Sequence, residues 1–200
     1  MQIGLLGGTF DPPHYGHMWL AETAKEQLNL DRVLFLPVGQ PPHKQDQVVT
    51  AVQHRLAMTK LAIQSNPFFH LDTTDIDRPQ PHATNSLLPI IQTKYPGARV
   101  WLLLGADSLR DFASWEAPVK IIVQCRLGVL GRPGATPDWQ YLNQIVPGLP
   151  EAVDILSGPA VAISSTEIRQ WAAAGNSVRY LVQTAVWQYI SENKLYDRQR

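Results

Sequence analysis

The chain has 200 residues, 44% of them apolar, enough for a substantial core in one large domain or one domain with a small lobe. Its 17 basic and 17 acidic side chains give a formal charge of zero, which argues against a nucleic-acid partner. The single cysteine, Cys125, excludes an internal disulfide and indicates a reducing cytoplasm. No apolar stretch approaches the ~20 residues of a membrane span, and the first residues do not resemble a signal peptide. We therefore expect a cytoplasmic protein without a membrane partner.

Strand-length apolar runs alternate with helical patterns along the chain. In chain order we predict a strand at 2–6, a helix at 17–28, a strand at 33–37, a polar loop at 38–49, a helix at 51–64, a strand at 68–71, a helix at 85–94, a strand at 100–104 followed by a short helix, a strand at 125–130, short strands at 153–156 and 161–163, and helices at 166–174 and 182–192. Residues 131–160 are rich in Pro and Gly, and we expect a loosely packed excursion there.

The alternation of strands and helices predicts βαβ units and a parallel sheet. The strands are continuous apolar runs, as is typical of a sheet with helices on both faces. The fold class that we predict is α/β: a single Rossmann-like, doubly wound domain over 1–200 with a mainly parallel sheet. In such folds ligands bind beyond the carboxyl ends of the strands, near the point where the strand order reverses.

The stretch GGTFDPPHYGH lies between the first predicted strand and the first predicted helix. Its paired glycines allow close approach to a ligand, and its paired prolines stiffen the path. The free N–H groups and the dipole of the following helix attract phosphate. We place His14 before that helix and His17 in its first turn, so that both rings reach one point. Gly16 between them is expected to leave space for a phosphate against the backbone.

The residues of this corner argue against three other kinds of ligand site. The stretch is neither GxGxxG nor GxxxxGK[ST], which argues against a dinucleotide fingerprint and a Walker loop. Two nearby histidines without a cysteine or an obvious third ligand argue against zinc, so we predict no protein ligands for a metal. A glycine turn with two surface histidines and no ligand is the interpretation that competes with a phosphate site.

A second anion-binding pattern, ISSTEIRQW, lies near the C-terminus. Ser164 and Glu167 have the spacing of a capping box, which marks a helix start. Thr166 and Arg169 share one face of that helix. An Arg near a helix N-terminus opposes the dipole, and a bound polyanion would compensate for this; a capped helix with a solvated Arg is the competing interpretation. Together with the first corner, the pattern suggests two helix N-termini that converge on one polyphosphate.

GGTFDPPHYGH and ISSTEIR resemble the H-x-G-H and I-S-x-T-x-x-R signatures of the nucleotidyltransferase superfamily. Within it the chain is similar to the bacterial nicotinate-nucleotide adenylyltransferases. The finer matches are VGQPPHK at 38–44, HRLAM at 54–58, DIDRPQPHAT at 75–84, LLGADSL at 103–109, FASW at 112–115, GRPG at 131–134 and YISENKLY at 189–196. The resemblance implies adenylyl transfer from ATP to nicotinate mononucleotide in NAD biosynthesis. The products are deamido-NAD and pyrophosphate, and no covalent enzyme intermediate forms.

The resemblance also implies roles for individual residues. His14 and His17 would hydrogen-bond phosphate oxygens at the reacting centre, Lys44 would neutralise phosphates from a loop, and Arg169 would hold the β- and γ-phosphates. These four form the predicted catalytic set. The predicted ATP-binding set is Gly8, Thr9, Phe10, His17, Gly105, Asp107, Arg132, Ser165, Thr166 and Arg169.

The predicted acceptor-binding residues are Lys44, Thr84 and Trp115. Trp115 would stack on the pyridine ring, and at the nucleoside end Asp107 would accept from ribose hydroxyls. Each of three residues also fits a structural role: Lys44 as a solvated loop cation, Asp107 as a helix cap and Trp115 as core. Arg55 resembles a family position too, but it fits a structural ion-pair partner equally well.

Two departures from the family pattern concern the acceptor. His82 and Ala83 stand where the family usually has Ser and Tyr, and Glu116 stands where an aromatic commonly follows the stacking Trp. A Glu beside a carboxylate-binding pocket is repulsive, so nicotinamide mononucleotide is an alternative acceptor. Two further functions compete with this assignment: a related adenylyl- or cytidylyltransferase, with phosphopantetheine for instance as acceptor, and a non-catalytic nucleotide sensor.

The resemblance implies Mg²⁺ as the complex of ATP, held by phosphates and water rather than by the protein. The expected partners are ATP and nicotinate mononucleotide. A homo-oligomer is compatible with the sequence, which does not determine the number of subunits. Cys125 lies in an apolar strand and is expected to be inert packing.

Overall fold

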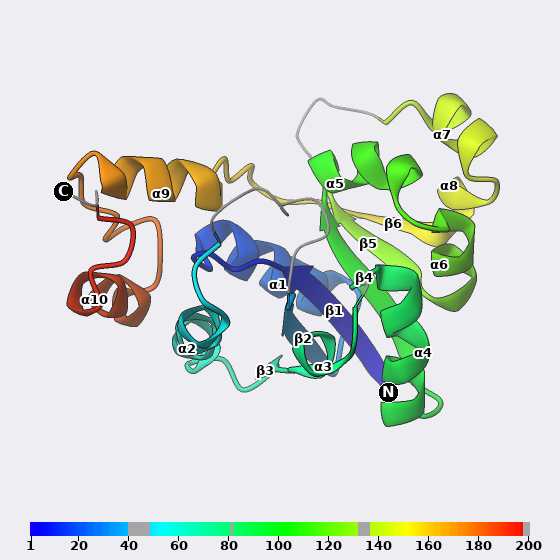
Figure 1. Ribbon diagram of the computed structural model, residues 1–200. Helices are drawn as coiled ribbons and strands as arrows, with labels where there is room; N and C mark the ends of the chain where they lie inside the picture. Colours follow the sequence, from blue (N-terminus) through cyan, green and yellow to red (C-terminus); the bar gives the residue numbers. More distant parts are fainter. Residues whose placement is uncertain (40–48, 81, 132–136, 198–200) are drawn as a thin grey trace.

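The structure, a computed structural model, describes residues 1–39, 49–80, 82–131 and 137–197. Its centre is a six-stranded sheet in the order β3-β2-β1-β4-β5-β6, in which all neighbouring strands are parallel. Helices lie on both faces of the sheet (Figure 1), so the predicted α/β fold class is confirmed. The strands are β1 Gln2–Gly8, β2 Arg32–Pro37, β3 Phe69–Leu71, β4 Arg99–Gly105, β5 Arg126–Leu130 and β6 Val153–Leu156.

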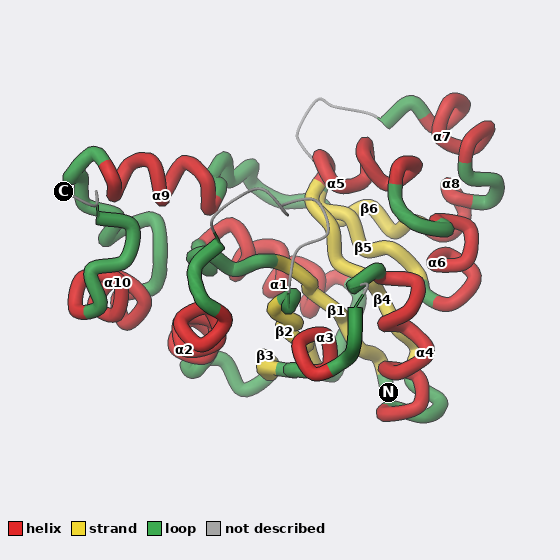
Figure 2. Tube along the Cα trace, in the orientation of Figure 1, coloured by secondary structure: helices red, strands yellow, loops and turns green. Residues whose placement is uncertain are grey.

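Helices lie between these strands in the chain, and helices also follow the last strand, β6 (Figure 2). None of the helices in the described ranges is long and apolar enough to cross a membrane. The helices are α1 Tyr15–Gln27, α2 Val52–Ile63, α3 Thr74–Asp77, α4 Thr84–Lys94, α5 Ala106–Asp111, the 3₁₀ turn η1 Phe112–Ser114, α6 Pro118–Gln124, α7 Trp139–Ile145, α8 Leu149–Ala152, α9 Ser165–Ala173 and α10 Thr184–Glu192.

Two hydrophobic cores, one on each face of the sheet, explain the continuous apolar strands. Successive side chains of a strand point to opposite faces, so Leu5 of β1 joins one core and Leu6 joins the other. Helices α1, α2, α9 and α10 bury their apolar residues in the Leu6 core. Helices α4 to α8 do so in the Leu5 core. Both faces are therefore covered, and the carboxyl edge of the sheet is where the loops can bind a ligand.

The strand order reverses between β1 and β4. From β1 the chain proceeds outward through β2 and β3, and it then returns to place β4 on the other side of β1. This order is that of doubly wound dinucleotide folds, in which the crevice beyond the reversal point holds the ligand. β1 ends at Gly8 and β4 ends at Gly105. Two stretches that the sequence singles out therefore begin at the reversal point.

Two predictions about the second half of the chain are wrong. Residues 161–163 form no strand: β6 is the edge of the sheet, and Ile163 packs against the Leu6 core from a connecting segment. The described part of 131–160 is not a loose excursion, because Leu142, Val146 and Leu149 are buried. They anchor the short helices α7 and α8 on the sheet. The short helices α3 and α6 were not predicted either.

Candidate active site

The turn between β1 and α1 brings both histidines of the H-x-G-H motif to one place. His14 directly precedes α1, and His17 lies in its first turn. The centroids of the two rings are 3.7 Å apart. The Phe10 ring meets His17 edge-on at 5.0 Å between centroids. Phe10 is itself buried with φ at +50°, a conformation that bulky residues rarely adopt, so this loop is held in an unusual shape.

Burial determines the protonation of both histidines. It lowers the pKa of His14 from 6.5 to about 4, against an opposing effect of Glu167. Burial, and secondly the neighbouring His14, lowers the pKa of His17 well below its ordinary value. His17 Nδ1 accepts a hydrogen bond from the His14 backbone N–H at 3.2 Å, so neutral His17 carries its proton on Nε2. At neutral pH the corner therefore offers neutral N–H donors rather than cations.

Gly16 does not leave the free space that we expected. A Cβ at this position would lie 3.0 Å from the His14 ring and 3.5 Å from the carbonyl oxygen of Ile163. A glycine is favoured here because a Cβ would press against the His14 ring, whereas its distance to the segment before α9 would be an ordinary contact. At Gly7, in contrast, a Cβ would meet no atom of the described residues within 4 Å.

The ISSTEIR segment contacts the H-x-G-H corner directly. The Ser165 hydroxyl donates to the Pro12 carbonyl at 2.8 Å, and Arg169 Nη1 donates to the Asp11 carbonyl at 2.7 Å. The predicted helix start is confirmed, since the Ser164 side chain caps α9 by accepting the Glu167 backbone N–H at 3.2 Å. The Glu167 carboxylate accepts the Ser164 hydroxyl at 2.7 Å instead of the Ser164 backbone N–H of a full capping box. The N-terminus of α9 thus lies against the loop that leads into α1. Ser165 lies 153 positions after Pro12, and Arg169 lies 158 positions after Asp11. Two segments that are distant in sequence therefore form one wall of the candidate site.

Two buried charged residues that support this corner were not predicted as such. Asp11 and Arg55 each have 2% of their surface exposed. The described contacts of Arg55 are not ion pairs; its guanidinium donates to four backbone carbonyls at 2.8–3.0 Å and so braces the loops around the site. The four acceptors are the carbonyls of Thr9, Val38, Gly39 and Thr50.

Asp107 lies at the carboxyl end of β4, as predicted, but it is not the helix cap. Gly105 occupies the cap position of α5, and Asp107 lies in the first turn, paired with the exposed Arg110. The Asp107 carboxylate is half exposed. Asp107 therefore lies just after the carboxyl end of β4, with Arg110 as an ion-pair partner.

Thr84 and Trp115 lie on the Leu5-core side of the reversal point. Thr84 is the first residue of α4 and lines a cavity of about 50 Å³ together with Gly7, Asp75 and His82. Trp115 is partly buried, with its ring 5.3 Å from that of Phe112 between centroids. It is thus neither core nor free, and one side of the ring rests on Phe112.

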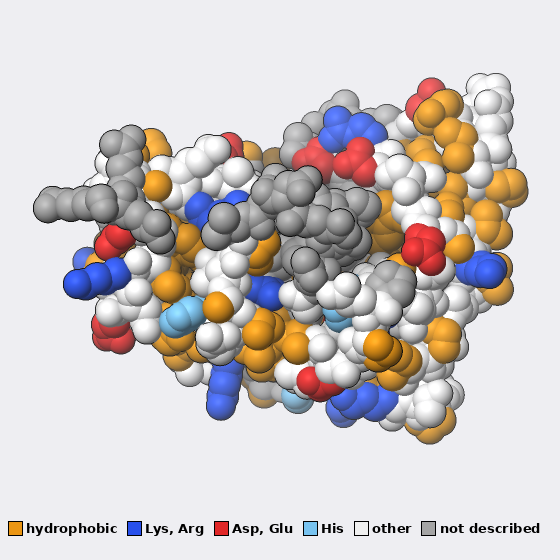
Figure 3. All heavy atoms as spheres, in the orientation of Figure 1, with side chains coloured by type: hydrophobic (Ala, Val, Ile, Leu, Met, Phe, Trp, Pro, Cys, Tyr) orange, Lys and Arg blue, Asp and Glu red, His pale blue; other side chains and the backbone are white. Residues whose placement is uncertain are grey.

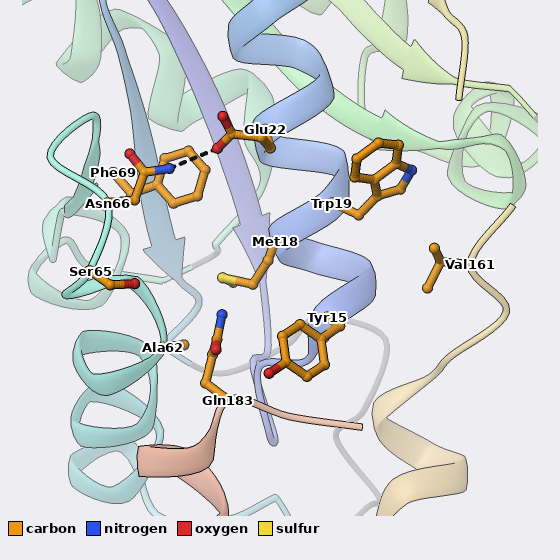
Figure 4. A pocket seen from close by; sticks show the side chains of 10 residues that line it. All are labelled: Tyr15, Met18, Trp19, Glu22, Ala62, Ser65, Asn66, Phe69, Val161 and Gln183. Atoms are coloured by element: carbon orange, nitrogen blue, oxygen red, sulfur yellow. Dashed lines mark hydrogen bonds between the residues drawn. The ribbon is translucent and has the colours of Figure 1, made fainter. Parts of the chain in front are cut away.

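A separate pocket of about 410 Å³ lies on the outer side of α1 (Figure 4). Tyr15, Met18 and Trp19 line it from α1, and Gln183 closes it from the segment before α10. Among the predicted catalytic residues that the structure describes, His14, His17 and Arg169, none lines this pocket. Over the face of the molecule seen in Figure 3, basic and acidic side chains are interspersed. Attraction for an anion must therefore come from the local groups of the corner.

Comparison with known proteins identifies the family. The family described as cytidylyltransferase-like matches residues 5–171. A protein of Thermomicrobium roseum, described as a "probable nicotinate-nucleotide adenylyltransferase", is 42% identical over 195 residues, which cover 98% of this chain and 91% of the relative. A protein of Roseiflexus sp. (strain RS-1) with the same description is 42% identical over 194 residues, covering 97% of each chain. The chain belongs to the nicotinate-nucleotide adenylyltransferase family.

Solved structures support the same fold. A Plasmodium falciparum nicotinic acid mononucleotide adenylyltransferase complexed with APC aligns with a TM-score of 0.77 at 19% identity, over 98% of this chain and 96% of that chain. The same enzyme complexed with NaAD aligns with a TM-score of 0.79 at 20% identity, over 98% and 97%. At this level of identity the likeness concerns the fold alone.

Where this adenylyltransferase departs from its family, the structure shows what the new residues contact. Glu116 accepts a hydrogen bond from the Asn85 side-chain amide at 3.1 Å. His82 is nearly buried, and its Nδ1 lies 3.8 Å from the carboxylate of Asp75, which is paired with Arg78. His82 therefore borders the cavity beside Thr84, and Glu116 lies in the segment that follows Trp115.

Two predicted residues, Lys44 and Arg132, lie outside the described residues. Among the residues that the structure does describe, no group of three His, Cys, Asp or Glu side chains could hold a metal ion. The site of this adenylyltransferase is thus built, in the described ranges, from two imidazoles, a guanidinium and helix N-termini.

Proposed function

We propose that the protein transfers the adenylyl group of ATP to nicotinate mononucleotide, giving deamido-NAD and pyrophosphate in NAD biosynthesis. The observation that carries the proposal is the direct hydrogen bonding of Ser165 and Arg169 to the loop of the H-x-G-H corner. It places two helix N-termini and a guanidinium beyond the carboxyl end of β1, where phosphates bind in doubly wound folds. The family relationship agrees with this chemistry.

The reaction needs no protein nucleophile. A phosphate oxygen of the mononucleotide attacks the α-phosphorus of ATP in line, the bond from that phosphorus to the α–β bridging oxygen breaks, and pyrophosphate leaves. Positioning and stabilisation of the spreading charge supply most of the catalysis. Cys125 takes no part: burial raises the pKa of its thiol to about 12, which leaves it protonated and inert.

The two imidazoles act as hydrogen-bond donors at the reacting phosphates. His17 offers Nε2–H, because its Nδ1 is engaged by the backbone. Hydrogen bonds to an anionic acceptor strengthen as negative charge builds up on it, so these contacts favour the transition state over bound ATP. His14 stands 3.7 Å from His17 between ring centroids and serves the same phosphates.

The start of α9 holds the β- and γ-phosphates in this proposal. Arg169 supplies the positive charge, and Thr166 lies beside it, with 3.4 Å between Nη2 and Oγ1. The Ser165 hydroxyl already donates a hydrogen bond to the Pro12 carbonyl, so Ser165 contributes its backbone N–H at the helix start. Lys44 and Arg132 are proposed to add charge at the acceptor and ATP ends, as the family resemblance implies.

The nucleosides fill the two sides of the reversal point. Gly8, Thr9 and Phe10 offer backbone groups to ATP, and Gly105 with Asp107 receives its ribose. Thr84 and Trp115 bind the pyridine ring of the acceptor, with Trp115 stacked on it. Magnesium arrives with ATP and is held by phosphate oxygens and water. We propose that residues 1–200 form one nucleotidyltransferase domain and that the protein acts in the cytoplasm. Assembly into a homo-oligomer stays a prediction.

A parallel assay of acceptors tests the proposed function. Pyrophosphate release is measured with ATP and, in separate reactions, nicotinate mononucleotide, nicotinamide mononucleotide or phosphopantetheine, with CTP in place of ATP as a further arm. We expect the highest kcat/KM with ATP and nicotinate mononucleotide. Release with phosphopantetheine or CTP, together with none from either pyridine mononucleotide, would overturn the assignment.

A further inference from the structure

The Asp11 carboxylate is buried beside the H-x-G-H corner with two uncharged hydrogen-bond donors. Oδ1 accepts from the Tyr196 hydroxyl at 2.7 Å, and Oδ2 accepts from the Thr50 backbone N–H at 3.1 Å. A buried carboxylate needs such partners, since leaving either oxygen unpaired is costly. The end of the chain, 185 residues away in sequence, therefore fixes the direction in which Asp11 points.

Arg169 contacts the backbone of the same residue instead of its carboxylate. Its Nη1 donates to the Asp11 carbonyl at 2.7 Å. Among the described residues, no carboxylate lies within ion-pair distance of Arg169. A guanidinium beside a carboxylate commonly forms a bidentate pair with it, yet here each carboxylate oxygen accepts a hydrogen bond from another donor, which orients the group. Within the described part of the chain, the charge of Arg169 near the start of α9 is thus not compensated by a carboxylate.

Tyr196 is held in place for this contact. Burial, and secondly the charge of Asp11, raises the pKa of Tyr196 far above its ordinary value, so the hydroxyl stays protonated and can donate. Its backbone φ is +67°, in the left-handed region that bulky residues avoid. Such a conformation persists where surrounding contacts require it. Here these are the Asp11 hydrogen bond and packing against the core that includes Met58.

We propose that Tyr196 is a positioning residue that keeps Arg169 available for ATP by holding the Asp11 carboxylate away from the guanidinium. The inference rests on the proposed function, in which Arg169 binds the β- and γ-phosphates. Without the Tyr196 hydroxyl, one buried oxygen of Asp11 lacks a donor. Arg55, another cation near Asp11, already donates to four carbonyls, so the carboxylate turns to Arg169. That ion pair competes with the phosphates of ATP.

The test compares Tyr196→Phe with a matched control, Tyr189→Phe. The control removes the same hydroxyl from a tyrosine that bonds His54 Nδ1 at 2.9 Å, between α10 and α2. We expect Tyr196→Phe to raise the KM for ATP about tenfold while kcat and the KM for nicotinate mononucleotide change less than about threefold. Tyr189→Phe should leave all three constants within about twofold. Equal KM values for ATP in the two variants would overturn the inference.

A second pair of variants separates the charge effect from a loss of stability. Asp11→Asn removes the charge that would pair with Arg169, so adding Tyr196→Phe should not raise the KM for ATP further. A further tenfold rise in that background would contradict the proposed mechanism. All variants are assayed below their unfolding temperatures, and the double variant carries the test if Tyr196→Phe alone is unfolded. Absence of pyrophosphate release by the wild-type protein would instead refute the proposed function.

Discussion

His17 has one ring nitrogen, Nδ1, that is hydrogen-bonded within the protein, and in the proposed function the other, Nε2, donates to a ligand. Nδ1 accepts the His14 backbone N–H at 3.2 Å, so the neutral ring carries its proton on Nε2. A phosphate oxygen accepts that hydrogen bond more strongly as it gains charge. In the proposed function, the contribution of His17 therefore belongs to the transition state more than to the binding of ATP.

Replacement of His17 should consequently separate catalysis from binding. We expect His17→Ala to lower kcat about 10²–10³-fold, while the KM for ATP changes less than about fivefold. His70, exposed on β3, supplies the control, because His70→Ala should leave both constants unchanged. Steady-state kinetics of the three proteins measure this. If kcat and ATP affinity fell by the same factor, a transition-state role for His17 would be excluded.

His14 should make stability depend on pH in a defined window. Its pKa is about 4 in the folded protein against an ordinary value of 6.5, so between these values the unfolded chain binds the proton more readily. The free energy of unfolding therefore decreases as the pH falls from 6.5 to about 4, by up to about 3 kcal/mol. The lowered pKa of His17 acts in the same direction.

Chemical denaturation at several pH values measures this dependence. The variant His14→Gln lacks the titrating ring and should show a smaller loss of stability over the same window. An identical pH profile for His14→Gln and the wild-type protein would show that His14 does not contribute.

Short motifs made some site residues predictable from sequence, and distance along the chain concealed others. Two short motifs, each recognisable from a few neighbouring residues, contain His14, His17, Ser165 and Arg169. The structure places the two segments in contact. The proposed role of Asp11 and Tyr196 depends on a hydrogen bond across 185 positions, which no local pattern shows. For Arg55 the sequence left two interpretations open, because its carbonyl partners are set by the tertiary structure.

Helix α2 serves the site through one buried side chain. Arg55 has 2% of its surface exposed and bonds the carbonyls of Thr9, Val38, Gly39 and Thr50. A planar guanidinium can reach several carbonyls at once, whereas an ammonium group is a single point with three donors. The loops at the ends of β1 and β2 are therefore tied to α2 by a contact that lysine cannot reproduce.

Arg55→Lys should destabilise the protein by roughly 2–4 kcal/mol, because buried carbonyls lose their donors. Lys60→Ala, an exposed change on the same helix, should stay within about 0.5 kcal/mol of the wild-type value. Urea denaturation of both variants gives the comparison. A stability of Arg55→Lys close to that of Lys60→Ala would show that the bracing contacts contribute little.

Elements with a strong apolar pattern were predicted, and elements defined by their partners were not. The strands near 2–6, 33–37, 100–104 and 125–130 are present because buried parallel strands leave continuous apolar runs. The apolar stretch 161–163 has the same local character but no neighbouring strand to pair with in the sheet that the structure describes. Helices α7 and α8 were hidden by the Pro and Gly content around them, although Leu142 and Leu149 anchor them.

At the scale of the whole molecule, the strand order creates the site. Alternating strands and helices predict a parallel sheet, but they do not say that β4 returns to the side of β1 opposite β2. Because of that reversal, the loops after Gly8 and Gly105 leave the carboxyl edge of the sheet in different directions. The last third of the chain then places α9 against the loop between β1 and α1. The convergence of the two motifs is thus a property of the topology.

The most direct test of this account is the structure of the protein in complex with a non-hydrolysable ATP analogue and nicotinate mononucleotide. We expect His17 Nε2 about 3 Å from an oxygen of the α-phosphate and Arg169 on the β- and γ-phosphates. A triphosphate bound away from both residues, for example in the pocket beside Tyr15 and Trp19, would contradict the account.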